Sequence, residues 1–157
     1  MSRTKPKIEP NSPQRSAPRV GVGLLLVDSR QRVLLTLRRR PPEAGCWSIL
    51  GGKVDYLETL EDCAIREARE EAGVNVQLIR LLCVTDHVLP AEGQHWVAPA
   101  FLGRIVGGEV MNCEPDKTQE VMWYPFFGLP DRLTVTARRA IDAYLSGGHP
   151  FTPPANS

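Results

Sequence analysis

Three glutamates in the middle of the chain have the spacing of one helix face. Glu67, Glu70 and Glu71 are three and four residues apart, which places their carboxylates on one side of a helix within one turn. Like charges at this spacing repel by roughly 0.2–0.5 kcal/mol per pair, so the arrangement favours a cation that neutralises them. Carboxylate oxygens suit Mg²⁺ or Mn²⁺, which also accept phosphate oxygens. A solvated helix face balanced by Arg66 and Arg69 explains the same spacing.

The helix that must carry these glutamates is predicted over residues 59–72. This segment contains no glycine or proline, is rich in Glu, Arg and Ala, and is followed by Gly73, a typical residue at a helix C-terminus. Its small and apolar residues recur every four positions, which predicts a narrow buried stripe. The stripe consists of Leu60, Ala64, Ala68 and Ala72.

Strands are predicted on both sides of this helix, without a strict alternation of strand and helix. They are apolar, β-branched segments at residues 19–28, 32–37, 46–50, 74–88, 96–106 and 121–127. A turn at residues 28–31 predicts that the first two strands pair as a hairpin, and Gly51-Gly52 is expected to end the third. A closing helix is expected at residues 134–145. These elements predict an α/β (α+β) fold, with a mixed β-sheet sandwiched between helices.

Length and composition suit one folded domain with two polar ends. The chain has 157 residues, of which 42% are hydrophobic and 24% charged, and this is typical of a globular protein with one domain and a single hydrophobic core. Residues 1–18 contain four prolines, residues 147–157 contain three, and neither segment has many bulky apolar side chains. We therefore expect a basic, proline-rich tail at residues 1–18, a domain at residues 19–146, and a second flexible tail at residues 147–157.

Charge and hydropathy argue against several classes of partner. The chain has 19 basic and 18 acidic residues, so no overall charge attracts it to a nucleic acid duplex or a membrane surface. Its longest apolar run is far shorter than the roughly 20 residues of a membrane span, and its start lacks the apolar core of a secretory signal. The four cysteines are widely spaced and form no CxxC pair, which predicts reduced thiols in a cytoplasmic protein.

The stretch from Gly52 to Val74 resembles the signature of the Nudix hydrolase superfamily. That signature reads Gly-x5-Glu-x7-Arg-Glu-U-x-Glu-Glu-x-Gly-U, where U is an apolar residue. The sequence matches at every position, with Gly52, Glu58, Arg66, Glu67, Ala68, Glu70, Glu71, Gly73 and Val74. Similarity extends to residues 19–40, 47–52 and 120–123, so it covers most of residues 19–145. One departure is Leu50, where members usually have proline; it bears on the shape of the loop more than on the chemistry.

The resemblance implies a role for each matching residue. Glu67, Glu70 and Glu71 would bind Mg²⁺ or Mn²⁺ together with Gly52, and one of the carboxylates would accept a proton from the attacking water. Arg66 would orient Glu58 and the neighbouring carboxylates, for which a plain ion pair on the helix surface is the alternative.

Three further assignments lie at the edge of the signature or beyond it. Glu120 lies where many Nudix enzymes place an additional carboxylate that binds metal or acts as the base; a surface glutamate beside a buried strand is the alternative. Arg38 and Arg39 follow the second expected strand and, with Gly51 and Gly52, are candidates for binding phosphates; a basic loop end explains them equally well. His87 and His95 are interpreted as ordinary strand or loop histidines.

The segments at residues 86–98, 107–109 and 114–117, which precede residues 120–123, are similar to MutT-like nucleoside triphosphate diphosphatases. By that resemblance the segment from Glu114 to Lys117 would border the base. We therefore expect a nucleoside triphosphate, with an ordinary, oxidised or otherwise modified base, to be hydrolysed to monophosphate and pyrophosphate. An ADP-ribose or NDP-sugar pyrophosphatase shares every signature residue. A non-catalytic nucleotide-binding module typically lacks the carboxylates present here, and an isopentenyl-diphosphate isomerase needs a reactive cysteine without counterpart in this sequence. The expected partner is a small-molecule nucleotide, and the sequence leaves open whether the protein forms a homodimer.

Overall fold

Two sheets and two main helices make up the computed structural model, which describes residues 17–147. A four-stranded sheet has the order β4-β1-β6-β5, and a three-stranded sheet has the order β3-β2-β7. The strands are β1 (Arg19–Leu26), β2 (Arg32–Arg38), β3 (Trp47–Ser48), β4 (Leu50–Lys53), β5 (Val74–Leu89), β6 (Gln94–Gly108) and β7 (Thr118–Pro125). The helices are α1 (Leu60–Ala72) and α2 (Val135–Leu145), with short 3-10 turns η1 (Pro90–Glu92) and η2 (Phe126–Gly128).

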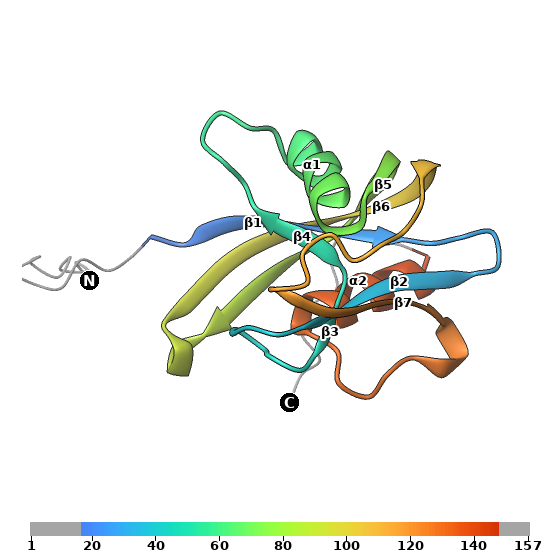
Figure 1. Ribbon diagram of the computed structural model, residues 1–157. Coiled ribbons are helices and arrows are strands. Elements are labelled where there is room, and N and C mark those ends of the chain that lie inside the picture. The colour runs from blue at the N-terminus through green and yellow to red at the C-terminus, as the bar shows by residue number, and fades with distance from the viewer. Residues whose placement is uncertain (1–16, 148–157) are drawn as a thin grey trace, which may run out of the picture.

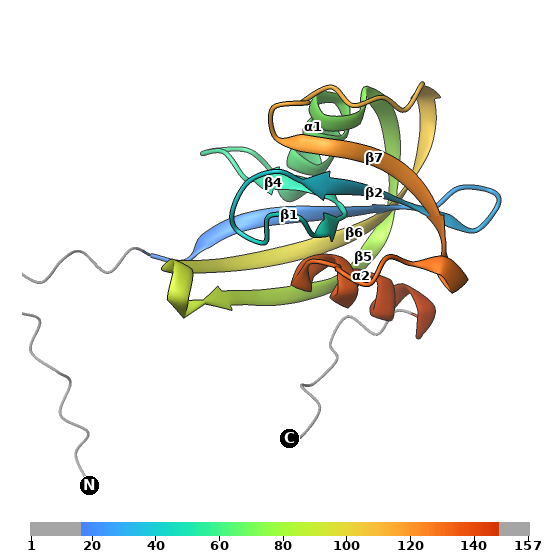
Figure 2. The ribbon, with the colours of Figure 1, turned by 60° about the horizontal axis from the view of Figure 1, so that its bottom comes forward.

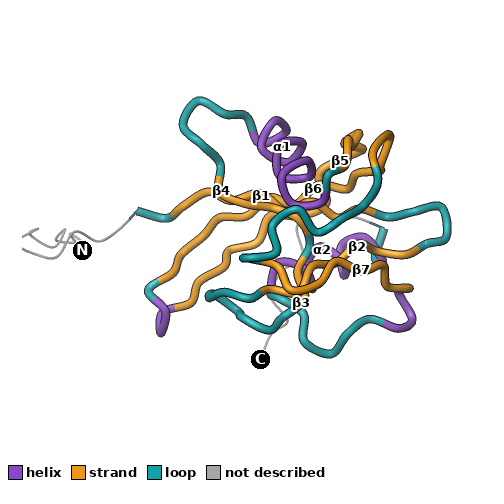
Figure 3. Tube along the Cα trace, viewed as in Figure 1, coloured by secondary structure: helices purple, strands orange, loops and turns teal. Residues whose placement is uncertain are grey.

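The helices cover opposite faces of the four-stranded sheet, α1 above it and α2 below it (Figures 1 and 2). β1 pairs in parallel with β6 and antiparallel with β4, so the sheet is mixed, as predicted. The tube in Figure 3 shows long loops at the ends of the strands around β3 and β4. The tails predicted at residues 1–18 and 147–157 lie outside the described residues, apart from residues 17, 18 and 147.

The core consists of two layers because β1 is buried on both faces. Leu24 and Leu26 pack in one cluster with the alanine stripe of α1. Leu25, which points the other way along the strand, packs in a second cluster with Ala137 and Ala140 of α2. The predicted stripe of α1 is confirmed at Ala64, Ala68 and Ala72, which are fully buried, while Leu60 is partly buried.

The predicted hairpin between the first two strands is wrong. β1 and β2 follow each other through a tight turn but belong to different sheets, and only one isolated bridge, between Val27 and Val33, connects them. The reason is that both edges of β1 are occupied, by β4 and by β6. β2 pairs instead with β3 and β7.

The strand predicted at residues 46–50 is also different in the structure. It divides into β3 and β4, which lie in different sheets, and the chain passes from one to the other at Ile49. Gly51 and Gly52 do not end a strand but lie inside β4, paired with Gly23 and Val22 of β1. Gly51 has a φ of 152°, and a Cβ atom there would collide with the backbone of Val22, so only glycine permits this approach.

Within residues 17–147 no helix is long and apolar enough to cross a membrane. All four cysteines are free thiols; Cys63 and Cys83 are buried, Cys46 is partly buried and Cys113 is exposed.

Candidate active site

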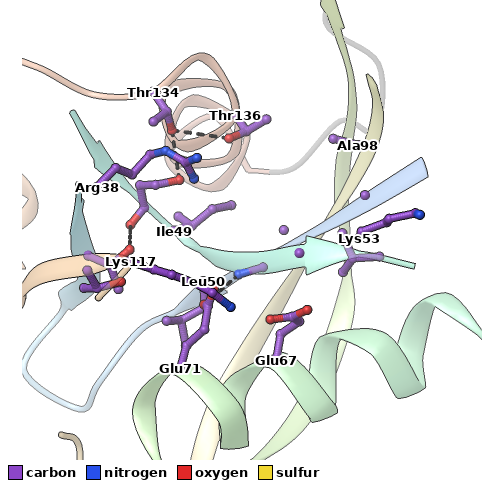
Figure 4. Close-up of a pocket in the computed structure, with 18 of the residues that line it drawn as sticks. Arg38, Ile49, Leu50, Lys53, Glu67, Glu71, Ala98, Lys117, Thr134 and Thr136 are labelled. Atoms are coloured by element: carbon purple, nitrogen blue, oxygen red, sulfur yellow. Dashed lines mark hydrogen bonds between the residues drawn. The ribbon is translucent and has the colours of Figure 1, made fainter. Parts of the chain in front are cut away.

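A cavity of about 590 Å³ runs along β4 and reaches both helices. Figure 4 shows Glu67 and Glu71 on one side of β4, and Thr134 and Thr136, at the start of α2, on the other side. The cavity can reach both sides because β4 is an edge strand of its sheet. Its volume lies within the roughly 300–1,000 Å³ typical of small-molecule sites.

The two ends of α1 set the position of the predicted carboxylates. The Thr59 hydroxyl accepts a hydrogen bond from the Asp62 amide at 3.1 Å, which caps the first turn. Gly73 ends the helix with a left-handed φ of 69°, and its amide donates to the carbonyls of Ala68 and Arg69. Glu67, Glu70 and Glu71 all line the cavity from the last two turns between these caps.

Arg66 is the centre of an ion-pair network next to these carboxylates. Its Nε donates to Glu58 Oε1 at 2.6 Å and its Nη2 donates to Glu58 Oε2 at 2.9 Å, which is a bidentate pair. Its Nη1 donates to Glu67 at 2.9 Å and to Glu70 at 3.1 Å. Hydrogen bonding from Arg66 lowers the pKa of Glu58 to about 2. Arg66 therefore holds the loop before α1 against the helix and orients two of the predicted ligands.

The absence of a side chain at Gly52 leaves room for the carboxylate of Glu67. A Cβ atom on Gly52 would collide with that carboxylate, so any other residue would have to displace the end of the Glu67 side chain. The Glu67 side chain is only 12% exposed, and burial raises its pKa. The backbone of Gly52 and the carboxylate of Glu67 thus form one surface of the cavity.

Glu71 is bound to the neighbouring glycine. Its Oε2 accepts a hydrogen bond from the Gly51 amide at 3.0 Å. Burial first, and then the negative charge of Glu67, raise the pKa of Glu71 to about 8. The neighbouring carboxylates of Glu67 and Glu71 therefore both have raised pKa values. A bound cation would stabilise their charged forms.

Arg38, Lys117 and Glu114 bring further charge to the same cavity. Arg38 is held by a hydrogen bond from its Nε to the Pro42 carbonyl at 2.9 Å. Lys117 Nζ donates to Glu114 Oε1 at 3.0 Å, and this bond raises the pKa of Lys117. The charge of Glu114 contributes to the raised pKa values of both Glu67 and Glu71, which shows that Glu114 lies towards the carboxylates of α1.

Two predicted site residues do not line the cavity, and their roles stay predictions without geometric support. Arg39 is exposed, and its Nε donates to the carbonyl of Pro115 at 2.8 Å. Glu120 is exposed on β7, where it pairs with Leu37 of β2. Burial and then the charge of Glu120 raise the pKa of Tyr124, so this carboxylate lies near an aromatic side chain of its own strand.

Glu43 and His87 line the cavity although sequence reasoning assigned them no role. His87 Nε2 lies 3.3 Å from Glu43 Oε2. The two residues are 44 positions apart, on a loop and on β5, and no local pattern relates them. Only the fold, which places that loop beside β5, could reveal the pair.

A NUDIX domain family model matches residues 17–144. The chain belongs to the NUDIX family. The predicted superfamily and the mixed fold are thereby confirmed, and the predicted hydrolase class agrees with the Nudix hydrolases to which this Nudix domain is similar.

Three relatives of this Nudix domain illustrate the range of the family. A MutT NUDIX hydrolase from Burkholderia pseudomallei is 44% identical with a TM-score of 0.78, over 82% of this chain and 98% of that one. The NAD-capped RNA hydrolase NudC of Pseudomonas putida (strain GB-1) is 30% identical over 131 residues, which are 83% of this chain and 45% of that protein. A Bacillus subtilis (strain 168) protein named as a candidate 8-oxo-dGTP diphosphatase is 29% identical over 127 residues, 81% of this chain and 80% of that protein. The chain thus spans less than half the length of its NudC relative.

Nudix hydrolases use a divalent metal ion, and the donor set of this Nudix domain fits one. Three carboxylates and a glycine backbone offer only oxygen ligands, which suits a hard divalent cation. In the described part of the chain no three acidic, His or Cys side chains converge on one point. Arg66 accounts for this, because it binds Glu67 and Glu70 while Glu71 turns to the Gly51 amide. Each of the three carboxylates keeps a second oxygen that accepts no hydrogen bond within residues 17–147, and these oxygens would hold the cation.

Proposed function

We propose that this Nudix domain hydrolyses a nucleoside triphosphate to a monophosphate and pyrophosphate, with Glu67, Glu70, Glu71 and Gly52 binding Mg²⁺. The observation that carries the proposal is the meeting of these oxygen ligands with the cationic side chains Arg38 and Lys117 in one cavity of nucleotide size. Mn²⁺ can replace Mg²⁺ at such a site because both prefer oxygen ligands.

Different residues of the chain bind the polyphosphate, position the metal ligands and accept a proton. Arg38 and Lys117 attract the polyphosphate, and the Gly51-Gly52 backbone lets it lie close to β4. Arg66 is a positioning residue, since its guanidinium group holds the carboxylates of Glu58, Glu67 and Glu70 by hydrogen bonds. One of the three carboxylates takes up the proton of the water that attacks phosphorus. When bound, the divalent ion offsets the negative charge of the phosphate oxygens.

A triphosphate is favoured over an NDP-linked substrate for two reasons. The Burkholderia MutT hydrolase is 44% identical to this chain, and the candidate 8-oxo-dGTP diphosphatase is 29% identical over 127 residues. Arg38 and Lys117, which line the cavity together with Arg40, Lys53 and Arg66, also suit the larger negative charge of a triphosphate. We further propose that residues 19–146 form the catalytic domain and that the protein acts in the cytoplasm, where its four free thiols would stay reduced.

The deciding experiment compares nucleoside triphosphates with ADP-ribose, NAD and NDP-sugars in the presence of Mg²⁺. We expect at least one triphosphate to exceed ADP-ribose tenfold or more in kcat/KM, a difference of ~1.4 kcal/mol in transition-state binding. Product analysis by anion-exchange chromatography should show monophosphate and pyrophosphate. A higher kcat/KM for ADP-ribose or an NDP-sugar would establish the rival pyrophosphatase activity, and binding without any hydrolysis would indicate a non-catalytic module.

A further inference from the structure

The cavity has a second polar end, on the α2 side of β4, which the hydrolytic chemistry does not use. Thr134 lines it there, together with Glu43, which binds the Val135 amide at the start of α2, and His87 beside Glu43. The carboxylates of α1 line the cavity on the other side of β4 (Figure 4). The apolar side chain of Ile49 lies between the two ends (Figure 4), and Ala98 also lines the cavity. Apolar walls with a few polar groups are typical of a site that binds a flat, partly polar ligand.

His87 is the residue at this end that points to a ligand. It is buried, with 7% of its surface exposed, and its Nε2 atom has no hydrogen-bond partner among residues 17–147. The carboxylate of Glu43 is near, at 3.3 Å, but the two groups do not have hydrogen-bond geometry. Buried polar atoms in folded proteins are nearly always hydrogen-bonded, so an unpaired nitrogen in a cavity wall indicates a partner from outside the chain.

Glu43 is held in place by the helix on the far side of the sheet. Its Oε1 accepts a hydrogen bond from the amide of Val135 at the start of α2, at 3.0 Å. Its side chain is 17% exposed. One carboxylate oxygen is therefore fixed by the protein, and the other, Oε2, stays beside His87. The two groups form a hydrogen-bond acceptor and an imidazole nitrogen at a fixed separation of 3.3 Å.

We propose that Glu43 and His87 select the base of the nucleotide by binding a lactam edge, a ring N–H next to a carbonyl, as in guanine and hypoxanthine. Glu43 Oε2 accepts from the ring N–H, and Nε2 of His87, in its N–H tautomer, donates to the adjacent carbonyl. Adenine has no such edge, because an acceptor nitrogen lies next to an amino group in its ring. The proposal rests on the proposed nucleotide substrate, and it places the base on the α2 side rather than beside Glu114 and Lys117.

The first test uses product nucleotides without metal, so that it does not depend on catalysis. Isothermal titration calorimetry in EDTA should show that the wild-type protein binds GMP at least tenfold more tightly than AMP. Glu43→Gln keeps an acceptor for the Val135 amide but puts a donor at the ligand side, so the preference should shift at least tenfold towards AMP. His87→Phe should weaken GMP binding at least tenfold and leave AMP binding within twofold.

Matched controls separate this effect from a general loss of structure. Glu92→Gln and His95→Phe make the same changes at exposed positions outside the cavity and should keep the GMP preference. Melting temperatures show whether each variant is folded; should His87→Phe not fold, Glu43→Gln alone decides. Equal binding of GMP and AMP by the wild-type protein, binding of neither at millimolar concentration, or unchanged selectivity in folded Glu43→Gln would overturn the proposal.

The same variants distinguish this proposal from the proposed function. With Mg²⁺, the ratio of kcat/KM for GTP over ATP should fall at least tenfold in Glu43→Gln. If the wild-type protein hydrolyses no triphosphate but GMP binding depends on both residues, the triphosphate function is wrong and the base site stands. If triphosphates are hydrolysed and both variants affect GTP and ATP equally, the base site is wrong and the function stands.

Discussion

Helices α1 and α2 approach the four-stranded sheet from opposite faces in the same manner. Each begins at a threonine whose hydroxyl accepts an amide hydrogen bond from the first turn, Thr59 in α1 and Thr134 in α2. Each turns alanines to the sheet, and these are almost fully buried: Ala64, Ala68 and Ala72 in α1, and Ala137, Ala140 and Ala143 in α2. Only α1, however, brings charged side chains into the cavity.

The difference shows that packing and chemistry are separable requirements on a helix. The alanines allow close approach and serve stability in both helices. The glutamates of α1 are an addition that stability does not explain, because burial raises the pKa of Glu67 and Glu71 and so disfavours their charged forms. Asp142 of α2, by contrast, is exposed and does not line the cavity.

The largest effect is expected from removing a charge of α1 that faces the cavity. Glu70→Gln or Glu71→Gln should lower kcat by at least ~10²-fold, the size of a major electrostatic contribution to catalysis. The fold should persist, since the change also removes like-charge repulsion. Steady-state kinetics and circular dichroism would test this, with Asp142→Asn of α2 as the matched control. Full activity in EDTA, or in either glutamine variant, would contradict the metal-binding role of α1.

A smaller loss is expected when the Glu67 carboxylate is displaced from its place beside β4. In Gly52→Ala the new methyl group would collide with the Glu67 carboxylate, and we expect kcat/KM to fall roughly 10- to 10²-fold, as displaced active-site groups do. Gly107→Ala is the control, because its Cβ would lie 3.5 Å from Asn75 Nδ2, an ordinary contact. Wild-type kinetics in Gly52→Ala would mean that the close approach of β4 to Glu67 has no part in the reaction.

Replacing a buried alanine by a larger residue in each helix compares how α1 and α2 contribute to stability and to activity. Ala68→Leu in α1 and Ala140→Leu in α2 place a larger side chain at fully buried positions, and each should lower the free energy of unfolding by about 1–3 kcal/mol. Only Ala68→Leu should also lower kcat, because Glu67 is its neighbour in the chain. Urea denaturation followed by kinetics would show this, and an equal loss of kcat in both variants would contradict the separation of the two roles.

The smallest effect concerns the ion pair between Glu58 and Arg66. The pKa of Glu58 is lowered from 4.5 to about 2, so its contribution to stability is present above pH 4.5 and is lost as the pH falls towards 2. Glu58→Gln should therefore reduce the melting temperature above pH 4.5, and its difference from the wild-type protein should disappear near pH 2. The effect is modest because Arg66 keeps Glu67 and Glu70 as partners. A difference independent of pH would show that Glu58 acts through packing.

Local sequence was a good guide to α1 and a poor one to strand pairing. The lack of glycine and proline, the stop at Gly73 and the alanine spacing predicted α1, and the structure confirms the helix, its end at Gly73 and its buried alanines. The hairpin and the strand at residues 46–50 were wrong, because a strand has no internal hydrogen bonds and its partners are decided by distant segments.

The sequence by itself was enough to determine the family and to place the three carboxylates of α1 on one face of the helix. Residues three and four positions apart always lie on the same helix face, so their spacing in the sequence is sufficient. Tertiary structure alone decided the rest of the site. It placed Gly52 against Glu67, brought Arg38 and Lys117 to the same cavity, left Arg39 and Glu120 outside it, and put His87 beside Glu43. These contacts join segments far apart in the chain, and only the packing of two sheets and two helices sets the distances between them.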